Sequence, residues 1–127
     1  MKILVIEDEP TSRKLASLVL QCEGHQVVDV ESAEEAIDIV SVQRPDLILV
    51  DLALPGMNGL VLARRLKEDS QTRSIPIVAV TSYPDRFPRE AAFDAGCDAF
   101  IVKPIDTRKL PAQVAAAAAN HSQSGPI

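Results

Sequence analysis

The chain has 127 residues, a length typical of a single domain. Its 13 basic and 18 acidic residues give a formal net charge of -5, which disfavours nucleic-acid binding through bulk charge. Aromatic residues make up 3% of the chain and tryptophan is absent, so a stacking platform for bases or sugars is not expected. No segment reaches the roughly 18 consecutive apolar residues that span a bilayer, and the apolar run at the N-terminus is too short for a signal peptide. We therefore expect a cytoplasmic protein with no membrane or nucleic-acid partner.

The two cysteines, Cys22 and Cys97, lie far apart in the sequence. Because no export signal precedes them, we expect both thiols to be reduced. Free cysteines are among the most buried residue types, so we predict that both are structural residues of the core.

The chain begins with alternating strand and helix patterns. The apolar run 3–6 predicts a strand buried on both faces, and Pro10 suits the first turn of the helix that follows. Apolar residues at helical spacing give this helix a predicted inward stripe, which consists of Leu15, Leu18, Val19 and Cys22. A second strand is predicted over 27–30. The next helix begins at a capping box formed by Ser32 and Glu35, and its predicted inward stripe consists of Ala33, Ala36, Ile37 and Val40.

The second half of the chain continues the alternation. Further strands are predicted at 46–50, 75–80 and 99–102. Of the three remaining helices, the first is capped by Asn58 and the second, a short one, ends at Gly96. The last helix begins at about Thr107 and includes the alanine run 115–119, which favours helix intrinsically.

Five strands that alternate with five helices predict an α/β fold built from right-handed βαβ units. We expect a doubly wound, flavodoxin-like domain with a parallel sheet in the order 2-1-3-4-5 and helices on both faces. Residues 1–119 are assigned to this domain, and 120–127 to a flexible C-terminal tail.

Polar residues follow four of the predicted strands, and these residues are Glu7, Asp8, Asp51, Thr81 and Lys103. Ligands of open α/β sheets bind beyond the carboxyl ends of the strands. Neighbouring strands lie about 4.8 Å apart, so we expect these side chains to converge on one patch.

The chemistry of this patch indicates a metal and phosphoryl site. Clustered carboxylates repel one another unless a proton or a cation intervenes, and an all-oxygen set suits Mg²⁺, for which Mn²⁺ could substitute, rather than zinc. Asp51 could be a nucleophile that accepts a phosphoryl group. Lys103 and the Thr81 hydroxyl could then contact the phosphoryl oxygens.

With these residues in place, the sequence resembles the receiver domain of two-component response regulators. The resemblance covers about residues 2–118 and is carried by the segments ILVIEDEP, PDLILVDLALPGMNG, IPIVAVTS and AGCDAFIVKPI. It implies that Asp51 is phosphorylated from a phosphohistidine. It also implies that Asp8 and Asp51 bind Mg²⁺ directly, that Glu7 acts through water, and that the backbone carbonyl of Ala53 completes the protein ligands.

The resemblance assigns further roles by position. Thr81 and Phe100 correspond to the switch pair, Lys103 to the family's lysine, and Ala53 and Tyr83 to positions that tune the phosphoryl lifetime. The peptide between Lys103 and Pro104 is commonly cis in the family. Departures are small: the acidic pair is Glu-Asp rather than Asp-Asp, the switch aromatic is Phe, and the loop 83–88 contains two prolines.

The implied partners are a histidine kinase or a histidine phosphotransfer protein, and a downstream protein target. The target would bind the face of the fourth helix, fifth strand and fifth helix, which includes parts of 87–95 and 107–119. We expect a stand-alone receiver, a phospho-acceptor switch rather than an enzyme, which assists its own phosphorylation and dephosphorylation. A homodimer is a further possible partner arrangement.

Several alternatives are weighed against this interpretation. The domain could be a relay that passes the phosphoryl group to a phosphotransfer histidine, or a receiver from a longer hybrid histidine kinase. An aspartyl phosphatase is disfavoured because Ala53 stands where such enzymes have a second Asp, and an FMN carrier because the acidic run 7–9 would repel phosphate. Neither His25 nor His121 has a cluster that would support a phosphodonor role, and the loop 56–59 is interpreted as a turn and helix cap.

Overall fold

The computed structural model describes the backbone of residues 1–123 and the side chains of residues 1–119. Its strands are β1 (Lys2–Ile6), β2 (Gln26–Val30), β3 (Leu47–Asp51), β4 (Ile77–Thr81) and β5 (Ala99–Val102). Its helices are α1 (Pro10–Cys22), α2 (Ala33–Gln43), α3 (Gly59–Glu68), α4 (Arg89–Asp94) and α5 (Leu110–Gln123). The strands form one parallel sheet in the order β2-β1-β3-β4-β5. The predicted fold class and strand order are therefore confirmed.

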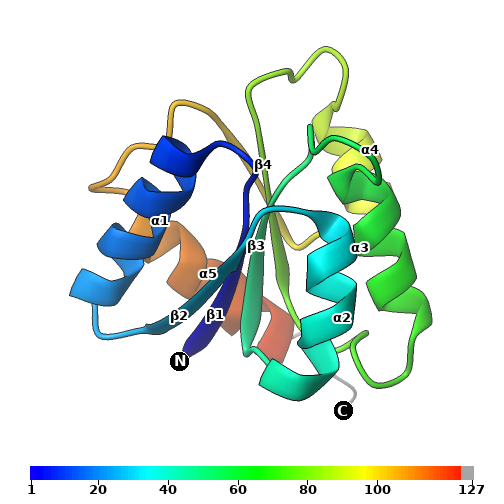
Figure 1. Ribbon diagram of the computed structural model, residues 1–127, viewed down its shortest axis with the longest axis horizontal. Coiled ribbons are helices and arrows are strands. Elements are labelled where there is room, and N and C mark those ends of the chain that lie inside the picture. The colour runs from blue at the N-terminus through cyan, green and yellow to red at the C-terminus, as the bar shows by residue number, and fades with distance from the viewer. Residues whose placement is uncertain (124–127) are drawn as a thin grey trace.

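Helices cover both faces of the sheet, with α1 and α5 on one side and α2, α3 and α4 on the other (Figure 1). Alternate residues of each central strand enter two separate apolar clusters. In β1, Leu4 and Ile6 pack toward α2, α3 and α4, whereas Ile3 and Val5 pack toward α1 and α5. This two-sided burial explains why the strands have unbroken apolar sequences.

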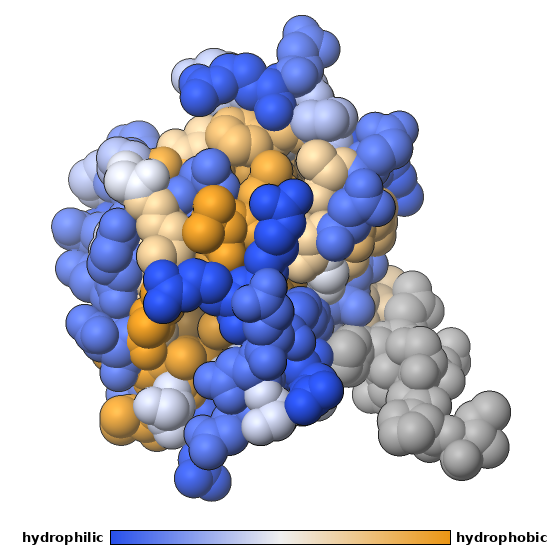
Figure 2. All heavy atoms as spheres, turned by 90° about the vertical axis from the view of Figure 1, so that its right-hand side faces the viewer, coloured by the Kyte–Doolittle hydropathy of each residue, from blue (hydrophilic) through white to orange (hydrophobic). Residues whose placement is uncertain are grey.

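The face formed by α2, α3 and α4 is mainly hydrophilic, with apolar side chains at the surface near its centre (Figure 2). The exposed large apolar residues of these helices are Val42, Val61 and Phe93. No helix in the described part of the chain is long and apolar enough to cross a membrane.

The inward face of α1 was predicted only in part: Val19 is partly buried against the apolar cluster on this side of the sheet, but the other predicted residues are not buried. Leu15 and Leu18 are 45% and 48% exposed, and the buried residues are Ala16, Ser17 and Leu20. The helix carries apolar residues on two adjacent stripes, and tertiary contacts decide between them: Ala16 allows close approach to the sheet, and the Ser17 hydroxyl donates a 3.0 Å hydrogen bond to Asp29 of β2. The predicted burial of Cys22 is wrong for the same reason, because this rotation exposes it. Cys97 is buried as predicted, and burial raises the pKa of its thiol to about 12.

Local capping signals fix the starts of α2 and α3. The amide of Glu35 donates to Ser32 Oγ at 3.1 Å, while the Glu35 carboxylate accepts from the Glu31 amide. The amide of Val61 donates to Asn58 Oδ1 at 3.0 Å, so Asn58 is the N-cap of α3. The helix α5 begins at Leu110, three residues later than expected, and extends to Gln123. The division at residue 119 stays a prediction, and residues 124–127 of the proposed tail lie outside the described residues.

Candidate phosphoryl and metal site

The carboxyl ends of the strands bring the predicted acidic residues together at one edge of the sheet, the upper edge in Figure 1. Ile6 of β1 is in register with Val50 of β3, so Glu7, which follows β1, and Asp51, the last residue of β3, lie at the same level. One carboxylate oxygen each from Glu7, Asp8 and Asp51 lies within 4.8 Å of the others. This cluster was predicted from the positions of the residues at the carboxyl ends of the predicted strands.

Lys103 joins two of these carboxylates. Its ammonium group donates hydrogen bonds to Glu7 and, at 3.0 Å, to Asp51 Oδ2. Its backbone is fixed by a 2.8 Å hydrogen bond from its amide to the carbonyl of Thr81, at the end of β4. The ammonium group thus balances part of the acidic charge.

The environment of the cluster raises the pKa values of both Glu7 and Lys103. Burial raises the pKa of Glu7 to about 7, the hydrogen bond from Lys103 opposes this rise, and the neighbouring Asp51 adds to it. For Lys103, burial alone would lower the pKa, but the hydrogen bonds to Glu7 and Asp51 outweigh burial and raise it. The site therefore has an excess of negative charge that a proton or a cation would relieve.

The donor set fits a hard divalent cation. Three carboxylates and one ammonium group leave a surplus of two negative charges when all are ionised. The donors are oxygens, and the exposed Asp8 opens the cluster to solvent, which suits Mg²⁺ because Mg²⁺ retains several water ligands.

Asp51 is held in one orientation. It is 8% exposed, its Oδ1 accepts a 2.9 Å hydrogen bond from the amide of Ala53, and its Oδ2 accepts from Lys103. A carboxylate fixed in this way, within an acidic cluster and next to a lysine, has the fixed orientation that favours nucleophilic chemistry.

Comparisons with known proteins identify the family of this chain. The family model of the response regulator receiver domain matches residues 3–115. The chain belongs to the response regulator receiver domain family. The resemblance inferred from the sequence is thereby confirmed.

Two relatives and one solved structure illustrate the range of receivers that it resembles. The chain is 35% identical to the phosphate regulon transcriptional regulatory protein PhoB of Pseudomonas aeruginosa over 90% of this chain, and it spans about half the length of PhoB, 50%. It is 35% identical to the polar-differentiation response regulator DivK of Brucella anthropi, with 85% of this chain and 88% of DivK covered. The receiver domain of a signal transduction histidine kinase from Syntrophus aciditrophicus superimposes with a TM-score of 0.86 at 32% identity, covering 99% of this chain and 96% of that one.

Two further receiver positions, Thr81 and Phe100, lie on the neighbouring strands β4 and β5. Thr81 is fully buried, and its Oγ1 accepts a 2.9 Å hydrogen bond from the amide of Tyr83, whose side chain is exposed. Phe100 is partly buried against the apolar cluster of α2, α3 and α4, in register with Ala79 of β4. The peptide between Lys103 and Pro104 is cis, as the resemblance implied. His25 lies near the N-terminus, with its ring nitrogen 3.1 Å from the Met1 amino group, and the side chain of His121 lies outside the described residues.

Three residues that support the site were missed at the level of the sequence: Arg13, Glu34 and Gly59. The carboxylate of Glu34 accepts a 3.1 Å hydrogen bond from the amide of Met57, in the loop after β3. A Cβ at Gly59 would lie 2.7 Å from the backbone oxygen of Asp51. A glycine directly after the N-cap was a weak signal for such close approach. Charged residues on a helix usually face solvent, so the sequence carried no signal that Arg13 and Glu34 support the site.

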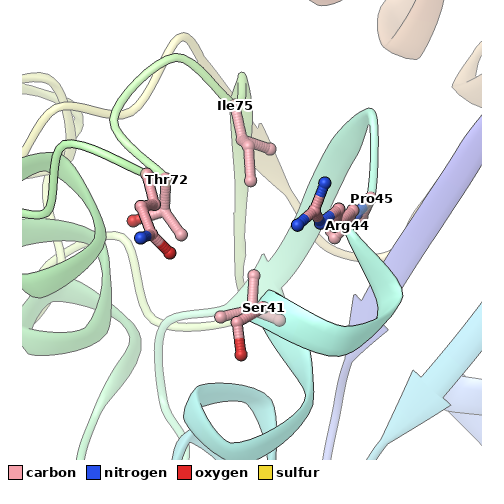
Figure 3. Close-up of a pocket in the computed structure, with 7 residues that line it drawn as sticks. Ser41, Arg44, Pro45, Thr72 and Ile75 are labelled. Carbon is pink, nitrogen blue, oxygen red and sulfur yellow. The ribbon is translucent and has the colours of Figure 1, made fainter.

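Two pockets differ in their relation to this site. A pocket of about 390 Å³ adjoins it and is lined by Ser12, Leu15, Ser82, Lys103, Pro104 and Ile105. A second pocket, of about 340 Å³, lies between the end of α2 and the loop before β4 (Figure 3). Its residues Pro45 and Ile75 precede β3 and β4, so it lies at the opposite edge of the sheet from Asp51.

Proposed function

We propose that this receiver accepts a phosphoryl group on Asp51 from the phosphohistidine of a histidine kinase or histidine phosphotransfer protein. The observation that carries the proposal is the Asp51 carboxylate, which Lys103 and the Ala53 amide orient within the cluster of three carboxylates. Transfer would form a bond from an Asp51 oxygen to phosphorus while the bond from phosphorus to the donor nitrogen breaks. Lys103 would then stay close to a phosphoryl oxygen and stabilise its charge.

We propose Mg²⁺ as the cofactor, with Mn²⁺ as a substitute. Asp8, Asp51 and the backbone carbonyl of Ala53 would hold it directly and Glu7 through water. Bound there, the ion would neutralise charge on the phosphoryl oxygens. The surplus negative charge of the cluster supports this assignment.

We propose that phosphorylation acts through Thr81 and Phe100. The buried Thr81 hydroxyl, which accepts from the Tyr83 amide, would turn toward the phosphoryl group. Phe100 would then change its packing, which shifts the population between two states of the receiver. Ala53 and Tyr83 would set how long the phosphoryl group survives, because they flank the site.

The downstream target would bind the face of α4, β5 and α5. Phe93 and Val102 are exposed there, and the guanidinium of Arg89 lies 4.9 Å from the centre of the Phe93 ring. Such an exposed apolar and cationic surface is suited to a protein partner. Homodimerisation through the same face would be one form of output.

The donor protein would bind the surface of α1. Leu15 and Leu18 are exposed on this helix, and Leu15 also lines the pocket that reaches Lys103. An apolar surface beside the phosphoryl site would place a partner's histidine near Asp51. We propose a cytoplasmic location, as the sequence predicted, because the donor kinases act there.

Labelling with a small-molecule phosphodonor tests the proposal. Incubation with phosphoramidate and Mg²⁺, followed by intact-mass spectrometry, should add one phosphoryl group to the wild type and none to Asp51→Asn. Asp38→Asn, a matched change at an exposed site on α2, should label normally. Labelling of Asp51→Asn at the wild-type rate would exclude Asp51 as the acceptor.

A relay function is the second candidate, and similarity to the receiver domain of a histidine kinase favours it. In a relay, Asp51 would pass the phosphoryl group to a phosphotransfer histidine. Radiolabelled phosphoprotein, mixed with candidate phosphotransfer proteins, would lose its label to them rapidly and reversibly. A single-domain switch would instead keep the label and bind its target more tightly.

A further inference from the structure

Arg13 on α1 reaches back to the acidic end of β1. Its side chain is only 17% exposed, and Nη1 donates a 3.1 Å hydrogen bond to the backbone oxygen of Glu7. Its Nη2 lies 3.4 Å from Oε1 of Glu31, an exposed carboxylate just after β2. The guanidinium fork therefore ties the end of β1 to the end of β2.

The Glu7 oxygen belongs to the peptide that joins Glu7 to Asp8. On its amino side, the amide of Glu7 donates to the carbonyl of Val30 at 3.1 Å. On its carboxyl side, the amide of Glu9 donates to Glu7 Oε2 at 3.2 Å. Arg13 supplies the contact that fixes the orientation of the intervening peptide plane.

Asp8 depends on this backbone. Its side chain is exposed, and no hydrogen bond or ion pair to it is found among the residues that the structure describes. Its carboxylate nevertheless lies in the cluster with Glu7 and Asp51. The direction of the Asp8 side chain is therefore set by the peptide that Arg13 holds.

We propose that Arg13 is a positioning residue for the metal site, which presets Asp8 for Mg²⁺ through the backbone oxygen of Glu7. This inference rests on the proposed Mg²⁺ site. Arg13 does not touch the metal, and Glu31 anchors the guanidinium from the other side. Groups that orient metal ligands from outside the coordination sphere typically change metal affinity by about 10–100-fold when removed.

A positioning role and a purely electrostatic role of Arg13 predict changes of opposite sign in Mg²⁺ affinity when Arg13 is replaced. A guanidinium near a cation site repels the cation, so loss of its charge alone would strengthen Mg²⁺ binding. Loss of the hydrogen bond to Glu7 would weaken Mg²⁺ binding, because Asp8 would no longer be preset. The sign of the change therefore separates a positioning residue from a surface charge.

The test measures Mg²⁺ affinity of the unphosphorylated full chain by isothermal titration calorimetry. Arg13→Met should weaken binding about tenfold, and Arg13→Lys, which keeps one donor, should recover part of the loss. Lys14→Met is the matched control, because the neighbouring Lys14 carries the same charge on the exposed side of α1. It should bind Mg²⁺ as the wild type does, or slightly more tightly.

A second measurement guards against unfolding. In NMR spectra recorded without Mg²⁺, the backbone amide resonances of Asp8 and Glu9 should shift in Arg13→Met but not in Lys14→Met. The amide resonances of β4 should stay in place in both variants, which shows that the fold is intact. If Arg13→Met binds Mg²⁺ as tightly as Lys14→Met, the proposal is overturned and the metal site stands. If the wild type binds no Mg²⁺, the metal site fails and the role of Arg13 fails with it.

Discussion

Lys103 and Asp51 are joined by a 3.0 Å hydrogen bond between Nζ and Oδ2, although 52 positions separate them in the sequence. The same ammonium group also binds Glu7. The two carboxylates thus share one cation, and their charges remain only partly balanced because Asp8 lies in the same cluster.

Replacement of Lys103 should separate metal binding from phosphoryl transfer. Lys103→Met leaves Glu7 and Asp51 without their common donor, so the cluster becomes more negative and should bind Mg²⁺ more tightly. Phosphorylation by phosphoramidate should nevertheless slow by about 10²–10³-fold, since a charge that stabilises the transferring group is lost. Calorimetry and intact-mass kinetics measure the two effects. Arg108→Met, a change at a strongly exposed cation outside the cluster, should alter neither.

The raised pKa of Glu7 predicts how stability depends on pH in the absence of metal. Because the pKa rises from 4.5 to about 7 on folding, the native state binds the Glu7 proton more tightly than the unfolded chain does. This contribution to stability is complete below about pH 4.5 and is lost as the pH rises through about 7. The shift corresponds to a loss of up to about 3 kcal/mol.

Comparison with Glu7→Gln isolates that contribution. The free energy of unfolding of the wild type, relative to Glu7→Gln, should fall between pH 5 and pH 8 in buffer with a chelator. Denaturant titration at several pH values measures the difference, from which the titrating groups that do not interact with Glu7 cancel. Excess Mg²⁺ should restore the stability of the wild type at pH 8, since the cation takes the place of the proton in balancing the negative charge. A difference that rises with pH would mean that Glu7 is stabilised in its ionised form.

Much of the architecture could be read from the sequence because local signals and burial agreed there. The Ser32 cap and the Asn58 cap are used as predicted, and β5 has the predicted bounds. The site residues could be placed because parallel strands end at one edge of the sheet, which turns positions along the chain into neighbours in space.

Other features could not be predicted because they depend on tertiary competition. On α1, Leu15 and Leu20 each belong to an apolar stripe, and only packing against the sheet selects the stripe with Leu20. The contact between Arg13 and the Glu7 oxygen is a side-chain to backbone bond, for which residue type alone gives no signal. The same holds for Glu34 and the amide of Met57.

Gly59 should resist replacement even though it lies in a helix. At an unhindered helical position, Gly→Ala stabilises by about 1 kcal/mol. Here a Cβ would lie 2.7 Å from the Asp51 backbone oxygen and 2.8 Å from the Leu52 Cα, and both are backbone atoms that cannot easily move. We expect Gly59→Ala to destabilise the protein by about 1–3 kcal/mol through overpacking and to slow phosphorylation by displacing Asp51. Thermal and denaturant unfolding measure the first effect, and a gain in stability would show that the loop after β3 adapts freely.

Thr81 should be needed for the response to phosphorylation but not for phosphorylation itself. Its hydroxyl contacts the Tyr83 amide and is not among the groups bound to Asp51 in the described structure. Thr81→Ala should therefore still label with phosphoramidate, although without the hydroxyl no hydrogen bond can link a phosphoryl oxygen to β4. Fluoroberyllate bound at Asp51 mimics the phosphoryl group. NMR spectra of the wild type should show chemical-shift changes at Phe100 and over α4 on its addition, and these changes should be absent in Thr81→Ala. Thr81→Ser retains the hydroxyl and should keep them, so equal shifts in all three proteins would remove Thr81 from the switch.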